Sequence, residues 1–356
     1  MGVLRRHRGR ALKPGFHARR LVKLLREKGR SLSPLTILTH DHPDPDALAS
    51  AWALAHLAQA LGNIRTRIVY GGVIGRAENR MMAERLLVPA RPLRKGELAG
   101  VPHLALLDTQ PPFKNNRCPP RRIPDLILDH HPRHADTHCD LALIDESVGA
   151  TTTILAEALL AADVRVPQRL ATAIVYGIGS ETQNLGREAT QRDMAAYQAF
   201  WPRANMKMLW RISYPQRSEQ FFMTLARAVR EAFIAGRVIG VNLGAVNTPD
   251  SVAQMADFLL TLEKISWSVV TARYLGRLHV SLRANDPGAG AGRLLKRLLG
   301  GGNRGGGHGM IAGGSIEVGG EVSEAVWREA EDKVINDFLA SQELESAALH
   351  HPFRNA

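Results

Sequence analysis

Residues 126–132 read Leu-Ile-Leu-Asp-His-His-Pro, so a short apolar run ends in an acid, two adjacent histidines and a proline. An apolar run of this length, bounded by turn residues, is typical of a buried strand. Asp129, His130 and His131 would then lie at or just past the carboxyl end of that strand. Burying two imidazoles there without partners would cost free energy, so the pair indicates a bound metal ion or phosphate group.

Similar apolar runs recur at 35–39, 103–107 and 141–144, and helical patterns lie between them. This alternation predicts a parallel sheet covered on both faces by the intervening segments. Ligands of such sheets bind beyond the carboxyl ends of the strands. The polar residues that fall at or just past those ends are His40, Asp44, Asp46, Asp108, Asp129, His130 and His131.

Residues 40–46, His-Asp-His-Pro-Asp-Pro-Asp, lead from one predicted strand into a helix. Asp44 and Asp46 are two residues apart, held by prolines, with the His40 imidazole just upstream. This arrangement suits neighbouring hard cations. A helix start with acidic residues in its first turn explains the same segment, and both interpretations remain open from this motif alone.

The pattern changes after residue 200, where Trp201-Pro202 breaks a helix. We predict an α/β fold with a parallel-sheet domain at 31–200, a helical connector at 201–235 and a smaller α/β domain at 236–346, preceded by a basic extension at 1–30 and followed by a tail at 347–356. Residues 177–182 and 305–314 are expected as loops. The second is either a flexible linker or, through converging glycine amides, an anion-binding loop.

The net charge of +12 is concentrated in residues 1–30, which hold 11 Lys or Arg and a single acid, Glu27. A helix that docks through Leu21, Val22, Leu24 and Leu25 is the favoured interpretation. The alternatives are an arm that attracts nucleic acid without sequence preference, and an organelle transit peptide.

Two cysteines are too few for a disulfide framework, and no secretory signal is visible, so a cytoplasmic protein is expected. The uncharged run 47–64 is interrupted by polar residues such as Ser50 and His56. It therefore predicts a buried helix in a soluble domain and no membrane partner. Monomer and homodimer both remain open.

Five motifs, taken in chain order, resemble the DHH phosphoesterase family with its DHH-associated C-terminal domain. A chain of this length is most similar to the branch that combines oligoribonuclease and 3′-phosphoadenosine-5′-phosphate phosphatase activity. The motifs are Asp-x-Asp at 44–46, Asp108, Asp-His-His at 129–131, Gly-Ile-x-x-acid-Thr at 177–182 and Gly-Gly-Gly-His at 305–308.

The resemblance implies two divalent ions, usually Mn²⁺, and a set of residues that serve them. Glu181 stands where the family usually has Asp, and its longer side chain would fit the second ion if the loop 177–182 lay further back. The resemblance assigns His40, Asp44 and Asp108 to the first ion; Asp46, Asp108, His130 and Glu181 to the second; His131, oriented by Asp129, to catalysis; and Arg283, Ser281, Gly306, Gly307 and His308 to the substrate.

The expected activity is metal-dependent hydrolysis of phosphoester bonds in short oligonucleotides or nucleotide bisphosphates. Cyclic dinucleotides and inorganic polyphosphate are alternative substrates. The alternative that is not an enzyme is a nucleotide-binding regulator with the same fold, which lost catalytic turnover because of Glu181.

Overall fold

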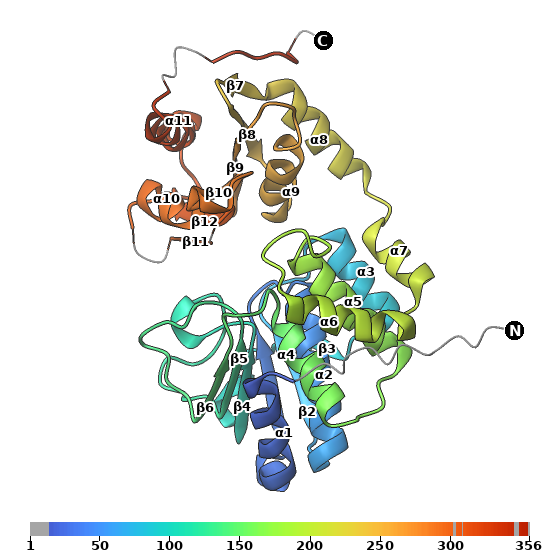
Figure 1. Cartoon of the computed structure of the whole chain (residues 1–356). Coiled ribbons are helices and arrows are strands. Elements are labelled where there is room, and N and C mark those ends of the chain that lie inside the picture. Colours follow the sequence, from blue (N-terminus) through green and yellow to red (C-terminus); the bar gives the residue numbers. More distant parts are fainter. Residues whose placement is uncertain (1–13, 302–303, 308, 345–348, 355–356) are drawn as a thin grey trace, which may run out of the picture. The chain divides into compact units, whose positions relative to one another are not determined.

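The computed structural model describes residues 14–301, 304–307, 309–344 and 349–354 (Figure 1). The chain divides into two compact units, Met1–Pro215 and Gln216–Ala356. The division falls inside the range 201–235 that the sequence assigns to a connector. Each unit has its own sheet and its own hydrophobic core.

The described part of the first unit contains a six-stranded parallel sheet in the order β3-β2-β1-β4-β5-β6. The sequence predicted four of these strands and missed β2 and β3. The strands are β1 (Leu35–Thr39), β2 (Thr66–Tyr70), β3 (Ala90–Pro92), β4 (His103–Leu107), β5 (Leu126–Asp129) and β6 (Leu141–Ile144).

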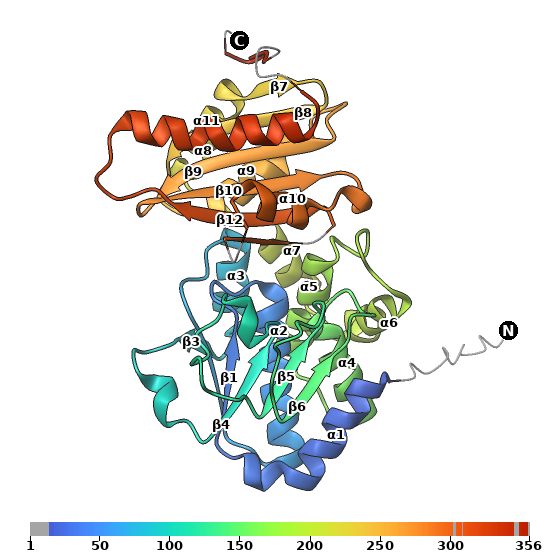
Figure 2. The same ribbon diagram turned by 90° about the vertical axis from the view of Figure 1, so that its left-hand side faces the viewer.

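In the described part of this unit, α-helices pack against only one face of the sheet, as Figures 1 and 2 show for α1, α2, α4 and α5. Short turns and loops around Leu98 and Val101 cover the other face, so the sequence was right about two covered faces but not about helices on both. The first unit's helices are α1 (Phe16–Lys28), α2 (Pro45–Gly62), α3 (Ala77–Leu86), α4 (Thr151–Ala161), α5 (Gln168–Glu181), α6 (Gln191–Phe200) and α7 (Met206–Ser213), with 3-10 turns η1 (Gly29–Leu32), η2 (Glu97–Gly100), η3 (Pro111–Phe113) and η4 (Trp201–Arg203).

Helix α2 shows why this chain segment folds as it does. Pro45 occupies the first helical position, and the Asp44 carboxylate caps the helix by accepting a hydrogen bond from the Ala47 amide at 2.9 Å. Asn63 ends the helix in the left-handed conformation, with φ of 49°. The helix between these ends is rich in alanine and largely buried, so it packs closely against the sheet and α5.

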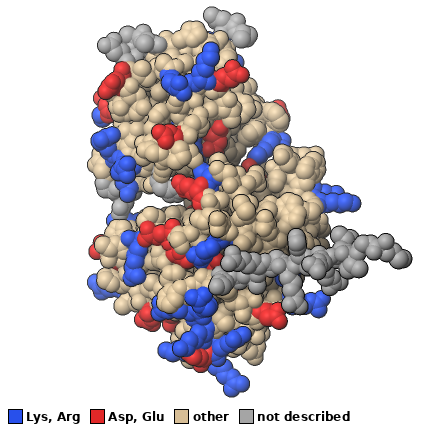
Figure 3. Space-filling model, viewed as in Figure 1, with Lys and Arg blue, Asp and Glu red and all other residues tan. Residues whose placement is uncertain are grey.

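The N-terminal helix α1 docks on the sheet, as the apolar spacing predicted. Leu21, Val22 and Leu25 are buried, and Leu24 packs against the same core. Residues 1–13 of the basic extension lie outside the described residues. On the face drawn in Figure 3, basic and acidic side chains are interspersed over the described surface.

The second unit has a mixed sheet in the order β11-β12-β10-β9-β8-β7, in which β8 and β9 are parallel and the other pairs antiparallel. Helices α8 and α9 pack on one face, and α10 and α11 on the other. The strands are β7 (Phe233–Ala235), β8 (Val238–Ala245), β9 (Trp267–Tyr274), β10 (Arg277–Ala284), β11 (Gly305–Gly307) and β12 (Ile311–Glu317); the helices are α8 (Glu219–Glu231), α9 (Asp250–Leu259), α10 (Ala291–Leu298) and α11 (Glu324–Ser341), with the turn η5 (Pro287–Ala289).

Two expectations need correction in this unit. The expected helical connector does not run to residue 235, because α8 ends at Glu231 and residues 233–235 pair as strand β7. Glycines 305–307 are not a loop, since they pair with β12 as strand β11. Within the described residues, no helix has the length and apolar character needed to cross a bilayer.

Candidate metal centre

The carboxyl ends of β1, β4 and β5 meet at one edge of the first unit's sheet, which we call the carboxyl edge. His40 directly follows β1, Asp108 directly follows β4, and His130 directly follows β5. The register aligns these ends, since Thr39 lies opposite Leu107 and Leu107 opposite Leu128. Parallel pairing therefore brings together residues that are up to 90 positions apart in the chain.

One group of possible metal ligands consists of His40, Asp44 and Asp108. The His40 Nε2 atom lies 3.7 Å from a carboxylate oxygen of each acid. The Nδ1 atom of the same ring lies 2.8 Å from the Asp41 carbonyl oxygen. A proton on Nδ1 would be donated to that carbonyl, so Nε2 is the nitrogen that faces the two acids. Burial lowers the pKa of His40, but Asp44 and Asp108 outweigh that effect and raise it to about 9 in the metal-free protein.

A second group consists of Asp108, His130 and His131. Asp108 Oδ1 lies 3.7 Å from His130 Nε2 and 3.7 Å from His131 Nδ1. Asp108 thus belongs to both groups. Its backbone φ of 59° is rare for a residue other than glycine, and its Oδ1 also accepts a hydrogen bond from the Thr151 hydroxyl at 2.8 Å. Strain of this kind persists where the surroundings hold a functional group in place.

Asp129 is fully buried and orients its neighbour. Its Oδ1 accepts hydrogen bonds from the His131 ring at 2.8 Å and from the His131 amide at 3.2 Å. Its Oδ2 accepts one from the Gln110 side chain at 2.7 Å. Gln110 is itself held, because its oxygen accepts from the His134 amide and the Thr137 hydroxyl. Sequence reasoning missed Gln110, since a glutamine after a strand carries no distinctive signal.

Asp46 lies in the first turn of α2 and is held by the start of α4. Its two carboxylate oxygens accept hydrogen bonds from the Thr151 amide at 2.7 Å and the Thr152 amide at 2.8 Å. Anions are stabilised at helix N-termini by such amides. Each oxygen keeps a second lone pair, so these bonds leave Asp46 able to contact a cation as well.

Glu181 is the last residue of helix α5, so the prediction that it lies in a loop was wrong. The side chain of Arg187 lies beside it. One guanidinium nitrogen of Arg187 donates to the Glu181 carbonyl at 2.9 Å and lies 3.8 Å from its carboxylate. The Arg187 side chain is only 8% exposed, and its Nε has no hydrogen-bond partner in the described part of the chain. Sequence reasoning missed this arginine.

The acids of the site repel one another. Burial, together with the charge of Asp44, raises the pKa of Asp108 to about 6. Burial and the charges of Asp44 and Asp108 raise the pKa of Glu181 to about 7. Burial and the charge of Asp108 also raise the pKa of Asp46 well above its ordinary value. Such a cluster of oxygen and imidazole donors fits divalent cations, whose charge would relieve this repulsion.

His131 differs from these acids, because its surroundings favour its positively charged form. Burial lowers its pKa, but the hydrogen bond to Asp129 and the charges of Asp129 and Asp108 outweigh that effect and raise the pKa to about 10. Without a bound cation, His131 is therefore positively charged at neutral pH.

The residues expected to contact substrate lie in the second unit. The Arg283 guanidinium is largely buried and donates to Ser281 Oγ at 2.7 Å and to the carbonyls of Leu282 and Ala312. It also pairs with Asp257. Gly306 and Gly307 are exposed in β11, and His308 lies outside the described residues.

Comparison with known families identifies both units. Residues 34–178 match the DHH family N-terminal domain, and residues 233–336 match the DHHA1 domain. An uncharacterized protein of Methanocaldococcus jannaschii is 32% identical over 331 residues, which cover 92% of this chain and 67% of the relative.

Two solved structures are similar to this chain, and the first of them has the same fold. An exopolyphosphatase-related protein from Bacteroides fragilis is 14% identical, with a TM-score of 0.71 over 91% of this chain and 98% of that chain. RecJ from Thermus thermophilus, solved in complex with Mn²⁺, is 15% identical, with a TM-score of 0.47 over 93% of this chain and 56% of that chain.

Proposed function

We propose that this chain, which belongs to the DHH family of metal-dependent phosphohydrolases, hydrolyses the phosphoester bonds of short oligonucleotides or nucleotide bisphosphates. The observation that carries the proposal is the pair of ligand groups that share Asp108 at the carboxyl edge. A carboxylate shared by two groups is what a site for two neighbouring cations needs.

In this proposal His40, Asp44 and Asp108 hold one divalent ion, with Mn²⁺ preferred. Asp108 and His130 of the second group hold the other ion, together with Asp46 and Glu181, which belong to neither group, and His131 is left to contact the phosphoryl group. When bound, the two ions supply positive charge to the phosphoryl oxygens and lower the pKa of water. The mixed oxygen and nitrogen donors suit Mn²⁺ chemically.

The chain's own residues bind and orient the phosphoryl group. Burial lowers the pKa of His131, but Asp129 outweighs that effect and raises it to about 10 in the metal-free protein, which favours a ring that holds an anionic oxygen or donates a proton to it. Asp129 keeps the His131 ring in one orientation, because its oxygen bonds both the ring and the backbone amide of that residue. We assign His131 to the reaction and Asp129 to its positioning.

The DHHA1 match supports a substrate larger than a single phosphate, because it adds a second unit with its own sheet. In this proposal Ser281, Arg283, Gly306, Gly307 and His308 contact the nucleotide. The largely buried Arg283 also braces its own strands, since it donates to the carbonyls of Leu282 and Ala312.

A panel assay tests the proposal. Purified protein with Mn²⁺ is given short RNA, 3′-phosphoadenosine-5′-phosphate, cyclic di-AMP, pyrophosphate and polyphosphate in parallel, and a chelator-treated sample serves as the control. Faster metal-dependent turnover of short RNA or the bisphosphate supports the assignment. Preference for cyclic di-AMP or polyphosphate would replace the substrate, and nucleotide binding without turnover would favour a regulator.

A further inference from the structure

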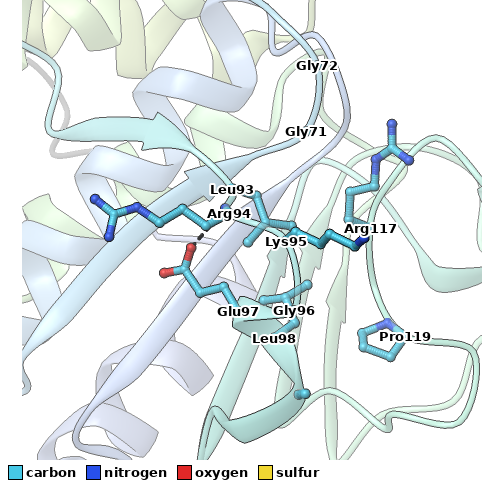
Figure 4. A pocket seen from close by; sticks show the side chains of 11 residues that line it. Gly71, Gly72, Leu93, Arg94, Lys95, Gly96, Glu97, Leu98, Arg117 and Pro119 are labelled. Carbon is cyan, nitrogen blue, oxygen red and sulfur yellow. Dashed lines mark hydrogen bonds between the residues drawn. The ribbon is translucent and has the colours of Figure 1, made fainter.

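A hollow of about 580 Å³ lies in the first unit. It is within the size range of small-molecule sites, roughly 300–1,000 Å³. Three chain segments line it: Gly71-Gly72 after β2, residues 93–99 after β3, and Arg117 with Pro119 in the loop after β4 (Figure 4). Each segment follows the carboxyl end of a strand, so the hollow opens at the carboxyl edge.

The sheet order places the hollow next to the metal ligands. Strand β2 pairs with β1, which ends at His40, and β3 pairs with β2. Neighbouring strands lie about 4.8 Å apart, so the segments after β2 and β3 lie roughly 5–10 Å across the sheet from the end of β1. That separation suits the next unit of a chain-like substrate.

Asp41 does not line the hollow itself, but it connects two of the lining residues to His40. Its carboxylate pairs with Arg117 at 2.9 Å, and its carbonyl oxygen contacts the His40 ring. A Cβ at Gly71 would overlap the Asp41 carboxylate, so glycine is required for this close approach. One residue therefore separates the lining of the hollow from a proposed metal ligand.

The hollow is positively charged. Arg94, Lys95, Arg117 and the acid Glu97 line it, and the charge of Arg117 is balanced by Asp41. Glu97 is already neutralised by Arg91 and accepts a hydrogen bond from the Arg94 amide. In the described part of the chain, the side chains of Arg94 and Lys95 have no ion-pair partner, and both residues are exposed. An anionic group would therefore be attracted here.

The remaining lining is apolar and includes Leu93, Leu98 and Pro119. A bare phosphate chain gains nothing from such side chains, whereas a nucleoside buries its base and sugar against them. The combination of cations and apolar surface, in a space of this size, matches a nucleoside joined to a phosphate.

We infer that this hollow is a subsite for the nucleotide unit next to the scissile phosphoester, with Lys95 contacting the phosphate beyond it. The inference rests on the proposed function, since it names where that substrate extends. The subsite would make the protein favour substrates with at least one phosphate beyond the bond that is cut.

Lys95→Glu tests the subsite, because an exposed side chain can be reversed in charge without disturbing the core. The matched control is Lys23→Glu, whose lysine is 73% exposed and lines a hollow at the opposite, amino edge of the sheet. The substrates are ApApA, which has a phosphate beyond the scissile bond, and unphosphorylated ApA, which has none. Fluorescence anisotropy with labelled trinucleotide, in an Asp108→Asn background, reports binding independently of turnover.

We expect Lys95→Glu to raise KM for ApApA about tenfold and to lower the slope of log affinity against log salt by about 1. The effect on ApA should be less than threefold, and the control should match wild type. Equal effects on both substrates, or no loss in anisotropy, would overturn the subsite. A lower KM for tripolyphosphate than for ApApA would overturn the nucleotide assignment. Absence of turnover by the wild type on every phosphoester would instead count against the proposed function.

Discussion

Asp108→Asn should make the metal-free protein more stable while removing its activity. Asp108 belongs to both ligand groups and is 2% exposed. Burial and the charge of Asp44 raise its pKa from 3.8 to about 6. Asparagine keeps the shape of the side chain and can still accept the hydrogen bond from the Thr151 hydroxyl, but it brings no charge.

The size of the effect follows from the pKa. A carboxyl whose pKa rises on folding stabilises the protein below its ordinary pKa, and this contribution is lost as the pH rises through the folded value. At 1.36 kcal/mol for each pKa unit, ionised Asp108 costs the metal-free fold about 3 kcal/mol at pH 8. The variant should therefore unfold up to about 10 °C higher at pH 8. Its advantage should shrink toward pH 4.

The assay compares thermal unfolding of wild type and variant at pH 8 and pH 4.5, each with chelator and with Mn²⁺, alongside turnover. Mn²⁺ should raise the melting temperature of the wild type far more than that of the variant, and turnover should fall by more than about 100-fold. Asp136→Asn is the control, because that side chain is 81% exposed. A metal-free variant less stable than wild type at pH 8, or one with near-normal turnover, would refute the reasoning.

Three further variants address the surroundings of the ligands. Glu181→Asp withdraws the carboxylate by about 1.5 Å, so we expect kcat to fall roughly 10- to 100-fold with weaker Mn²⁺ binding; a gain in both would favour a regulator. Arg187→Met removes the guanidinium beside Glu181. We expect kcat to fall about tenfold and the affinity for Mn²⁺ to change, which isothermal titration calorimetry would measure. Gln110→Leu takes one hydrogen bond from Asp129 and should lower kcat about tenfold with a smaller change in KM; equal loss of bound metal would contradict a positioning role.

The strand ends were predictable because local sequence is enough to identify them. Apolar runs marked β1, β4, β5 and β6, and parallel pairing then required their carboxyl ends to meet. Strands β2 and β3 were not predicted, because Thr66–Tyr70 contains a charged residue and Ala90–Pro92 has only three residues. The helices on a single face were also unpredictable, because loops can cover a sheet as well as helices do.

Partners from distant parts of the chain were not predictable. The amides that hold Asp46 come from Thr151 and Thr152, more than 100 residues away. Gln110 and Arg187 act through particular hydrogen bonds, which depend on the path of the folded backbone. A glutamine or an arginine in the sequence does not by itself indicate such a role.

The misread segment around Glu181 shows how packing overrides local preference. Glycine inside a helix costs about 1 kcal/mol relative to alanine, so Gly177 and Gly179 favoured a loop in sequence reasoning. In the structure α5 packs tightly on α2, and a Cβ at Gly177 would lie 2.9 Å from the Cβ of Ala49. The glycine is therefore what allows the two helices to approach.

The same contact limits how Glu181 can meet a cation. Because α5 is held against α2 at Gly177 and Arg187 binds the carbonyl at its last residue, the end of the helix has little freedom to advance or withdraw. Burial, followed by the charges of Asp44 and Asp108, raises the pKa of Glu181, so its carboxylate lies within the electrostatic influence of the first ligand group. A longer side chain on a fixed helix end can thus reach the centre without a displaced loop. Accordingly, we favour an active enzyme over a regulator.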